Sequence, residues 1–236
     1  MTNSYFSFKQ FTIYHDKCVF KVGTDGVLLG ASADVTGKDR ILDIGTGTGL
    51  IALILAQRCD ADINAIEPDH YSFEQAAENV KQSKWVGRIK VENCRLQDFE
   101  PDDLKFDLIV SNPPYFIDSL KNPDPARSAA RHNDGLTHGD LLKGASRLLD
   151  EDGLLQVIMP WEEGNMFIAE AQEFGFYCSS ILKIKPMPTS EIRRLILGFT
   201  RNKSKPTERF LTIEKGKRHD YTEEYIKLTK DFYLRF

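Results

Sequence analysis

Short apolar runs alternate with longer amphipathic segments along most of the chain. The runs fall at residues 40–44, 63–66, 89–96, 106–110 and 153–159. Between them lie segments with the 3.6-residue period of a helix, at residues 50–56, 73–80, 140–149 and 162–174. Strands that alternate with helices predict an α/β fold, in which helices cover both faces of a doubly wound, mostly parallel sheet.

Two further apolar runs, 179–184 and 194–199, follow the last of these helices. The short link between them contains Pro186 and Pro188, which favours an antiparallel hairpin at the edge of the sheet. The predicted fold is therefore a Rossmann-like, mostly parallel sheet of seven strands with an antiparallel edge hairpin. Near the end of the chain, Thr222 is a suitable N-cap for a further helix.

The strand at residues 40–44 runs into a glycine-rich turn, Asp43-Ile-Gly45-Thr-Gly47-Thr-Gly49. Glycines at a strand-to-helix turn let the backbone and its N–H groups approach a ligand closely. The dinucleotide fingerprint G-x-G-x-x-G would require glycine at position 50, where this chain has Leu50. Asp43 also disfavours an anionic pyrophosphate but would attract a cofactor that carries an ammonium group. The turn therefore favours a sulfonium cofactor over a dinucleotide.

Acidic residues follow the next two strands as well. Glu67 comes about 20 residues after Gly45, where a carboxylate can accept hydrogen bonds from both hydroxyls of a ribose. Asp98 and Phe99 follow the third strand and would place a carboxylate near an adenine amine and an aromatic ring beside the base. Each signal alone is weak, because an acid at a strand end is often only a helix cap.

The most specific signal is a tetrapeptide directly after the fourth strand, Asn112-Pro113-Pro114-Tyr115. The first and fourth strands are neighbours at the topological switch point of such a sheet, so the tetrapeptide would face the cofactor. The Asn112 side chain and the Pro113 backbone each offer a carbonyl that can accept an N–H of a planar amine. These bonds direct the nitrogen lone pair at a methyl group, and the prolines keep the turn rigid. Tyr115 can stack on the planar target, so all four residues are predicted to be catalytic.

With these motifs, the chain resembles the NPPY group of class I methyltransferases, and within it the bacterial tRNA1(Val) (adenine-37-N6)-methyltransferases. The narrower resemblance includes the segment Lys21-Val-Gly-Thr-Asp-Gly-Val-Leu-Leu-Gly30. It implies S-adenosyl-L-methionine as the cofactor and N6 of adenine 37, in the anticodon loop of a tRNA, as the acceptor. The expected cofactor-binding residues are Thr24, Asp25, Asp43, Gly45, Gly47, Gly49, Glu67, Asp98, Phe99 and Asn112.

The resemblance also implies an organisation for the chain. Residues 1–38 are expected to cover the cofactor site, residues 39–203 to form the methyltransferase domain, and residues 204–236 to be an extension packed on it. No apolar stretch reaches the length of a membrane helix, and the N-terminus lacks the features of a signal peptide. The cysteines and histidines form no metal-binding motif. We therefore expect a cytoplasmic monomer without a metal or a membrane segment.

Positive charge is concentrated in one part of an acidic chain. The formal net charge is −4, yet residues 181–218 hold eleven Lys and Arg against three Glu. A basic face on an acidic body is typical of contact with phosphates, although a solvated charged surface is the alternative interpretation. The predicted RNA-binding residues, expected to line the rim of the site along the edge hairpin, are Lys183, Lys185, Arg193, Arg194, Arg201, Lys203 and Lys205.

Three other functions use similar motifs. The first is a glutamine-N5 methyltransferase acting on release factors, because the lone pair of an amide nitrogen is delocalised in the same way. Such enzymes carry a helical N-terminal domain, whereas residues 1–42 are predicted to be loop and strand. A guanine-N2 methyltransferase acting on ribosomal RNA often carries a duplicated domain, for which 236 residues are too few. A non-catalytic RNA-binding scaffold would not need the hydrogen-bonding tetrapeptide.

Overall fold

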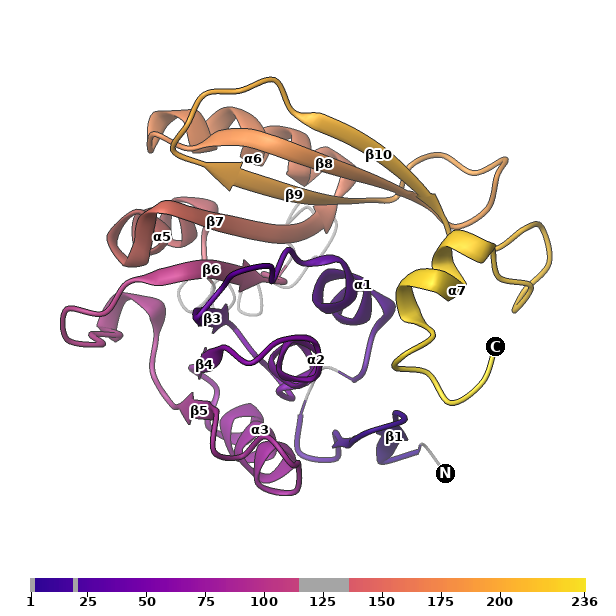
Figure 1. Ribbon diagram of the computed structural model, residues 1–236, viewed down its shortest axis with the longest axis horizontal. Coiled ribbons are helices and arrows are strands. Elements are labelled where there is room, and N and C mark those ends of the chain that lie inside the picture. The colour runs from indigo at the N-terminus through magenta and orange to yellow at the C-terminus, as the bar shows by residue number, and fades with distance from the viewer. Residues whose placement is uncertain (1–2, 19–20, 115–135) are drawn as a thin grey trace, which may run out of the picture.

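A large, mostly parallel β-sheet with helices on both faces organises the structure (Figure 1). In this computed structural model, residues 3–18, 21–114 and 136–236 are described. The strands of the sheet are β3 (Arg40–Ile44), β4 (Asp62–Ile66), β5 (Ile89–Glu92), β6 (Phe106–Ser111), β7 (Leu149–Pro160), β8 (Tyr177–Lys185), β9 (Arg194–Thr200) and β10 (Thr207–Thr212). Their order across the sheet is β10-β8-β9-β7-β6-β3-β4-β5. The strand β9 is antiparallel to both neighbours and the other pairs are parallel, which confirms the predicted fold class.

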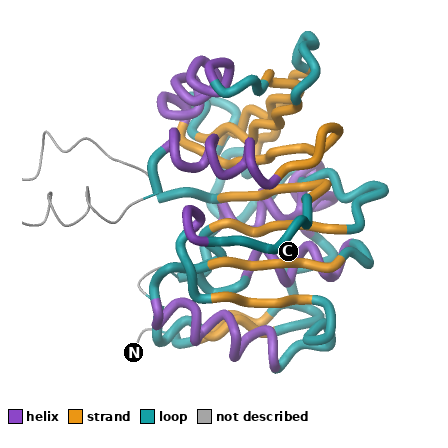
Figure 2. The backbone as a smooth tube through the Cα atoms, turned by 90° about the vertical axis from the view of Figure 1, so that its left-hand side faces the viewer, coloured by secondary structure: helices purple, strands orange, loops and turns teal. Residues whose placement is uncertain are grey.

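Helices pack on the sheet from two sides, and Figure 2 shows the strands of the sheet side by side along their length. One face carries α1 (Thr24–Ser32), α2 (Leu50–Arg58), α3 (His70–Lys81) and α7 (Glu223–Thr229), and the other carries α5 (His138–Leu148) and α6 (Trp161–Glu173). Successive residues of a strand point to opposite faces, so Ile41 joins the first apolar cluster and Leu42 the second. A sheet that is buried on both faces requires continuous apolar runs, which explains the pattern of the sequence.

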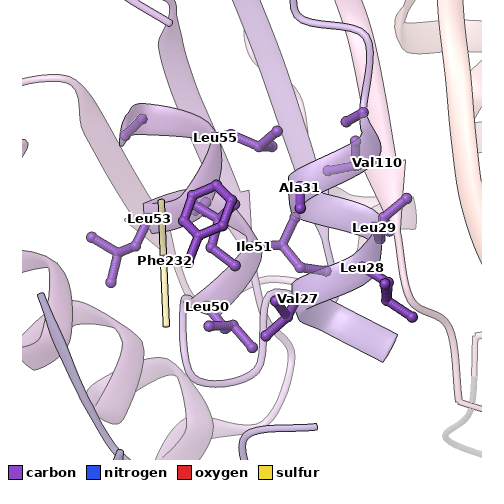
Figure 3. Close-up of a cluster of buried hydrophobic side chains, with 14 of the residues drawn as sticks. Val27, Leu28, Leu29, Ala31, Leu50, Ile51, Leu53, Leu55, Val110 and Phe232 are labelled. Carbon is purple, nitrogen blue, oxygen red and sulfur yellow. The ribbon is translucent and has the colours of Figure 1, made fainter. Parts of the chain in front are cut away.

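The helix α1 lies directly against α2, and its first turn lies beside the start of α2. A Cβ on Gly26 would come within 3.0 Å of the Leu50 side chain, and a Cβ on Gly30 within 2.8 Å of Ile54. Figure 3 shows the apolar side chains of both helices in one cluster, which Phe232 from the C-terminal segment also joins. The N-terminal and C-terminal segments therefore share the core of the central sheet.

Three elements differ from the sequence-based prediction. The sheet has eight strands rather than seven, because β10 pairs with β8 in parallel and covers the hairpin that was expected at the edge. The third strand ends at Glu92, and a short 3-10 helix, η1 (Leu96–Asp98), follows it. The N-terminal segment contains the helix α1 in addition to a small antiparallel hairpin, β1 (Tyr5–Ser7) and β2 (Thr12–Tyr14).

Local capping explains where two of the helices begin. The side chain of Thr137 accepts the Asp140 N–H and forms a capping box at the start of α5. The Thr222 side chain accepts the Tyr225 N–H, which confirms the predicted cap of α7.

Among the helices in the described ranges, none is long and apolar enough to cross a membrane.

Candidate functional site

The carboxyl ends of the central parallel strands meet at one edge of the sheet. There β3 and β6 lie side by side, with Ile44 paired to Ser111. The chain leaves β3 toward β4 and β5 on one side and returns through β6 and β7 on the other. Such a switch point is where open α/β sheets bind their ligands. Gly45 and Asn112 each follow this residue pair directly, so the glycine turn and the tetrapeptide start from adjacent strand ends.

The glycine turn adopts a backbone that other residues rarely allow. Gly45, Gly47 and Gly49 have φ angles of 71°, 58° and 80°, in the left-handed region. A Cβ on Gly45 or Gly47 would meet no atom of the described chain within 4 Å, so open space adjoins the turn at both positions. Gly49 is the N-cap of α2. The turn therefore presents bare backbone to a ligand at the positive end of a helix dipole.

Asp43 is fully buried at the end of β3, close to the turn. Its Oδ2 atom accepts hydrogen bonds from the Thr46 hydroxyl at 2.6 Å and the Ala52 N–H at 3.2 Å. Its Oδ1 atom has no hydrogen-bond partner within the described residues. Burial raises the pKa of Asp43 to about 7, because desolvation of the carboxylate outweighs these two bonds. A buried acceptor beside an open glycine turn suits a cationic donor such as an ammonium group.

Glu67 joins the glycine turn to the start of α3. Its Oε2 atom accepts the Gly47 N–H at 2.9 Å, and its Oε1 atom accepts the Asp69 N–H at 3.0 Å. The cap of α3 is Asp69, which accepts the Ser72 N–H, so Glu67 is not merely a helix cap. Burial raises the pKa of Glu67 despite these bonds. Each carboxylate oxygen has a second lone pair, which leaves capacity for ligand hydroxyls.

Asp98 and Phe99 have different surroundings at the end of η1. Asp98 is exposed, so its predicted contact with an adenine amine stays a prediction. Phe99 is only 3% exposed, and its ring lies 6.2 Å from that of Phe106 in the core. The ring therefore packs in the apolar core, and its predicted position beside the adenine stays a prediction.

The tetrapeptide begins where a side-chain bond ties β6 to β3. The buried Ser111 hydroxyl donates to the Ile44 carbonyl at 2.9 Å, one residue before Asn112. Asn112 is half-buried, Pro113 is buried and Pro114 is exposed. Tyr115 lies outside the described residues. The strand end therefore holds Asn112 and Pro113 at the switch point, where their carbonyl groups are the predicted acceptors.

The start of α1 is joined to β9 by an ion pair. The Arg194 Nε atom lies 2.7 Å from Asp25 Oδ2, and the two side chains are 32% and 23% exposed. Thr24 and Asp25 line a hollow of about 290 Å³ together with Arg193 and Arg194. The predicted cofactor contacts of Thr24 and Asp25 stay predictions. For Arg194, the pairing with Asp25 reduces the charge available to a phosphate.

Comparisons with known proteins identify the family. The sequence profile of the methyltransferase small domain matches residues 12–171. A tRNA1(Val) (adenine(37)-N6)-methyltransferase of Phocaeicola vulgatus is 51% identical over 99% of each chain. Proteins with the same name from Bacteroides fragilis and Trichodesmium erythraeum are 49% and 48% identical, and each alignment covers 100% of both chains. This chain belongs to the tRNA1(Val) (adenine(37)-N6)-methyltransferase family.

Solved structures place this family member among methyltransferase folds. A predicted O-methyltransferase from Agrobacterium tumefaciens superimposes with a TM-score of 0.67 at 21% identity, covering 88% of this chain and 96% of that one. The glycopeptide N-methyltransferase MtfA, solved with S-adenosylmethionine, gives a TM-score of 0.59 at 9% identity, covering 78% and 96%. At these identities the likeness shows the fold alone.

In this methyltransferase the seven predicted RNA-binding residues do not form one rim. The strands β8 and β9 are antiparallel, so Lys183 and Lys185 near the end of β8 share an edge with Arg193 and Arg194 at the start of β9. That edge also holds the end of β6, because β8, β7 and β6 all run in the same direction. The residues that follow β9, at the opposite edge, are Arg201, Lys203 and Lys205. The expectation that these three line the site is wrong.

Existing contacts distinguish the basic residues further. Lys183 forms a 2.6 Å ion pair with Glu208. Arg201 donates to the Ser146 carbonyl at 2.7 Å and lies over the Phe176 ring, so it stabilises the end of α5. Arg193 is exposed at the carboxyl edge of the sheet.

Within the described ranges, no group of three His, Cys, Asp or Glu side chains could hold a metal.

Two site residues escaped the sequence reasoning. Thr46 donates to Asp43 and Ser111 donates to Ile44, so both hydroxyls hold the strand ends that form the site. The sequence shows a threonine inside the glycine turn and a serine just before Asn112, but it does not show which acceptor each hydroxyl bonds. The ion pair of Asp25 with Arg194 joins residues 169 positions apart, and only the fold brings them together.

Proposed function

We propose that this protein transfers a methyl group from S-adenosyl-L-methionine to N6 of adenine 37 in the anticodon loop of tRNA1(Val). The single observation that carries the proposal is the start of Asn-Pro-Pro-Tyr one residue beyond the pairing of Ile44 with Ser111, next to the glycine turn. Membership of the family supports the reaction and the acceptor.

The residues around the turn suit the methyl donor. The Asp43 Oδ1 atom, which has no partner among the described residues, would accept from the cofactor's ammonium group, and the open space at Gly45 and Gly47 would admit the amino-acid end of the cofactor. Glu67 would accept from the ribose hydroxyls with the lone pairs that Gly47 and Asp69 leave free. When bound, the cofactor supplies an electrophilic methyl group on a sulfonium.

The acceptor amine requires positioning more than proton removal. The lone pair of an exocyclic aromatic amine is delocalised into the ring, so the nitrogen is a poor nucleophile. The Asn112 side-chain carbonyl and the Pro113 backbone carbonyl would accept its two N–H groups and turn its lone pair out of conjugation. The hydrogen bond from the Ser111 hydroxyl to the Ile44 carbonyl and the two prolines keep this turn rigid. Little conformational entropy would therefore be lost when the two carbonyls bind the amine.

The test is methylation of defined RNA. Purified protein, labelled S-adenosylmethionine and unmodified tRNA1(Val) should give one N6-methyladenosine, located at position 37 by nuclease digestion and mass spectrometry. A transcript with guanine at position 37 is the matched control. A label on guanine, or on a release factor and not on tRNA, would replace the proposal with one of the other methyltransferases, and RNA binding without methyl transfer would favour a scaffold.

We further infer a cytoplasmic monomer that holds tRNA at the carboxyl edge of the sheet. Lys185 and Arg193 are the predicted phosphate contacts, because both lie at that edge and Arg193 is exposed. Sedimentation of the protein with and without tRNA would check the monomeric state.

A further inference from the structure

A second cavity lies beside the start of α1, where Thr24 lines it. Its volume is about 480 Å³, within the range of small-ligand pockets. Besides Phe6, six of its lining side chains are aromatic or basic, namely His219, Tyr221, Tyr225, Tyr233, Arg235 and Phe236. These residues come from α7 and from the segments just before and after it, which Figure 1 shows beside α1. We refer to this cavity as the aromatic pocket.

The aromatic rings that line the pocket pack against one another, and one of them, Phe236, is exposed. Tyr221 stacks on Tyr225 with ring centroids 5.1 Å apart and planes at 27°. Phe236 stands edge-on to Tyr221 and to Tyr233, 5.8 Å from each. Tyr225 is buried, whereas Phe236 is 45% exposed. A planar ligand in the cavity would bury the exposed face of the Phe236 ring by stacking on it.

Polar groups at the rim suit a ligand with phosphates. The Nδ1 atom of His219 lies 3.1 Å from the Tyr221 hydroxyl, and its backbone N–H donates to Glu214 Oε1 at 2.8 Å. These contacts hold His219 at a φ of 68°, in the left-handed region that residues with a Cβ rarely adopt. Arg235, which lines the pocket, is exposed, and the loop that carries His219 also carries exposed Lys217 and Arg218.

The aromatic pocket lies next to the hollow beside Arg193. Three residues, Thr24, Pro186 and Ile213, line both. The strands β10, β8 and β6 run parallel, so the loops that follow them leave the sheet at the same edge as Asn112. A chain of nucleotides entering the site could therefore pass from Arg193 along the start of α1 to Phe236.

We propose that the aromatic pocket binds a second, unstacked base of the RNA substrate while the target adenine occupies the methyl-transfer site. The inference rests on the proposed function, because an enzyme that extracts a base from a loop leaves neighbouring bases unstacked. Aromatic side chains bind such bases through stacking without requiring one sequence. Arg235 and the basic loop contribute contacts to the adjoining phosphates.

Replacement of the exposed ring tests the pocket. Phe236→Ala should raise the Kd and KM for tRNA roughly five- to tenfold, the lower end of what one stacked base contributes. The Kd for S-adenosylmethionine and kcat at saturating tRNA should stay at the wild-type values, and Phe236→Trp should restore tRNA affinity. Tyr5→Ala is the matched control, since Tyr5 is also 45% exposed but does not line the pocket.

Photocrosslinking identifies the occupant directly. Transcripts with 4-thiouridine at single anticodon-loop positions should give an adduct on Tyr221 or Phe236 from one position, and Phe236→Ala should reduce its yield. If wild-type protein methylates adenine 37, yet no loop position crosslinks there and Phe236→Ala binds tRNA within twofold of wild type, the pocket proposal is overturned while the proposed function stands. Wild-type protein that methylates no tRNA adenine would instead overturn the proposed function.

Discussion

Two polar side chains at the switch point, Asn112 and Asp43, differ in how they are held. Asn112 is half-buried at a strand end, whereas Asp43 is fully buried with one carboxylate oxygen lacking a partner in the described part of the chain. We propose that Asn112 contacts the acceptor amine and that Asp43 interacts with the methyl donor. Substitutions at the two positions should therefore affect different steps.

Asn112→Ala removes one acceptor of the target N–H. We expect kcat to fall roughly 10²–10³-fold, as for the loss of one preorganised group that acts in the transition state. Affinity for S-adenosylmethionine, measured by calorimetric titration, should change little, because the glycine turn and Glu67 remain. Turnover within threefold of wild type would exclude the proposed role of the Asn112 carbonyl.

Asp43→Asn should change how stability depends on pH. Because the folded-state pKa of Asp43 is about 7 and its ordinary value is 3.8, the folded protein keeps a proton that the unfolded chain releases. The stability that results is present below about pH 4 and is lost as the pH rises through 7. The shift corresponds to about 4 kcal/mol in free energy of unfolding at most.

Urea unfolding of the cofactor-free protein at several pH values checks this expectation. Relative to wild type, Asp43→Asn should gain stability as the pH rises from about 4 to about 7 and little above that, and its affinity for S-adenosylmethionine should be lower than that of wild type. Parallel pH profiles for the two proteins would mean that Asp43 is already ionised in the folded state at neutral pH.

Which residues could be predicted depended on whether chemistry or packing selects them. The proposed methyl transfer requires carbonyl groups at a strand end that accept the N–H groups of the amine. The sequence Asn-Pro-Pro-Tyr offers such carbonyls, so its role could be predicted. An aromatic residue after a strand can pack equally well against a ligand or in the apolar core. For Phe99 the core uses the ring, and the local sequence does not distinguish the two cases.

At the level of elements, α1 shows how tertiary contacts replace local propensity. Its sequence contains Gly26 and Gly30, which disfavour a helix and explain why no helix was predicted there. Both glycines allow α1 to approach α2 closely. The strand β10 was missed for a related reason, since most of its residues are exposed and its sequence lacks an apolar run.

Gly30→Ala tests whether this close approach positions α1. A Cβ there would lie 2.8 Å from the Ile54 side chain, so we expect a loss of about 1–3 kcal/mol in free energy of unfolding. The affinity for S-adenosylmethionine should fall as well, because Thr24 and Asp25 start the same helix. Gly139→Ala in α5 is the control, since its Cβ would meet only the Thr137 hydroxyl at 3.9 Å. If denaturation midpoints show Gly30→Ala to be as stable as that control, α1 and α2 are not tightly packed.

At the scale of the whole molecule, strand direction determines where charge is displayed. The sequence located a basic segment, but the reversal between β8 and β9 brings Lys185 and Arg193 to one edge of the sheet, and the length of β9 takes Arg201 to the opposite edge. Composition cannot reveal that division, because it depends on which strands pair and in which direction. The edge with Arg193 contains the site, and the edge with Lys205 does not.

Arg193→Ala and Lys205→Ala test this division with two exposed cations from the same basic segment. Binding of tRNA measured at several salt concentrations should weaken for Arg193→Ala, and the slope of log K against log salt should become shallower by up to about 1, because one phosphate contact is lost. The Lys205→Ala protein should match wild type in affinity and slope, since its charge lies at the far edge. Equal losses in both variants would show that RNA wraps around the hairpin to the opposite edge. If salt has little effect even on the wild-type protein, phosphate contacts do not supply the affinity, and a protein substrate would account better for the site.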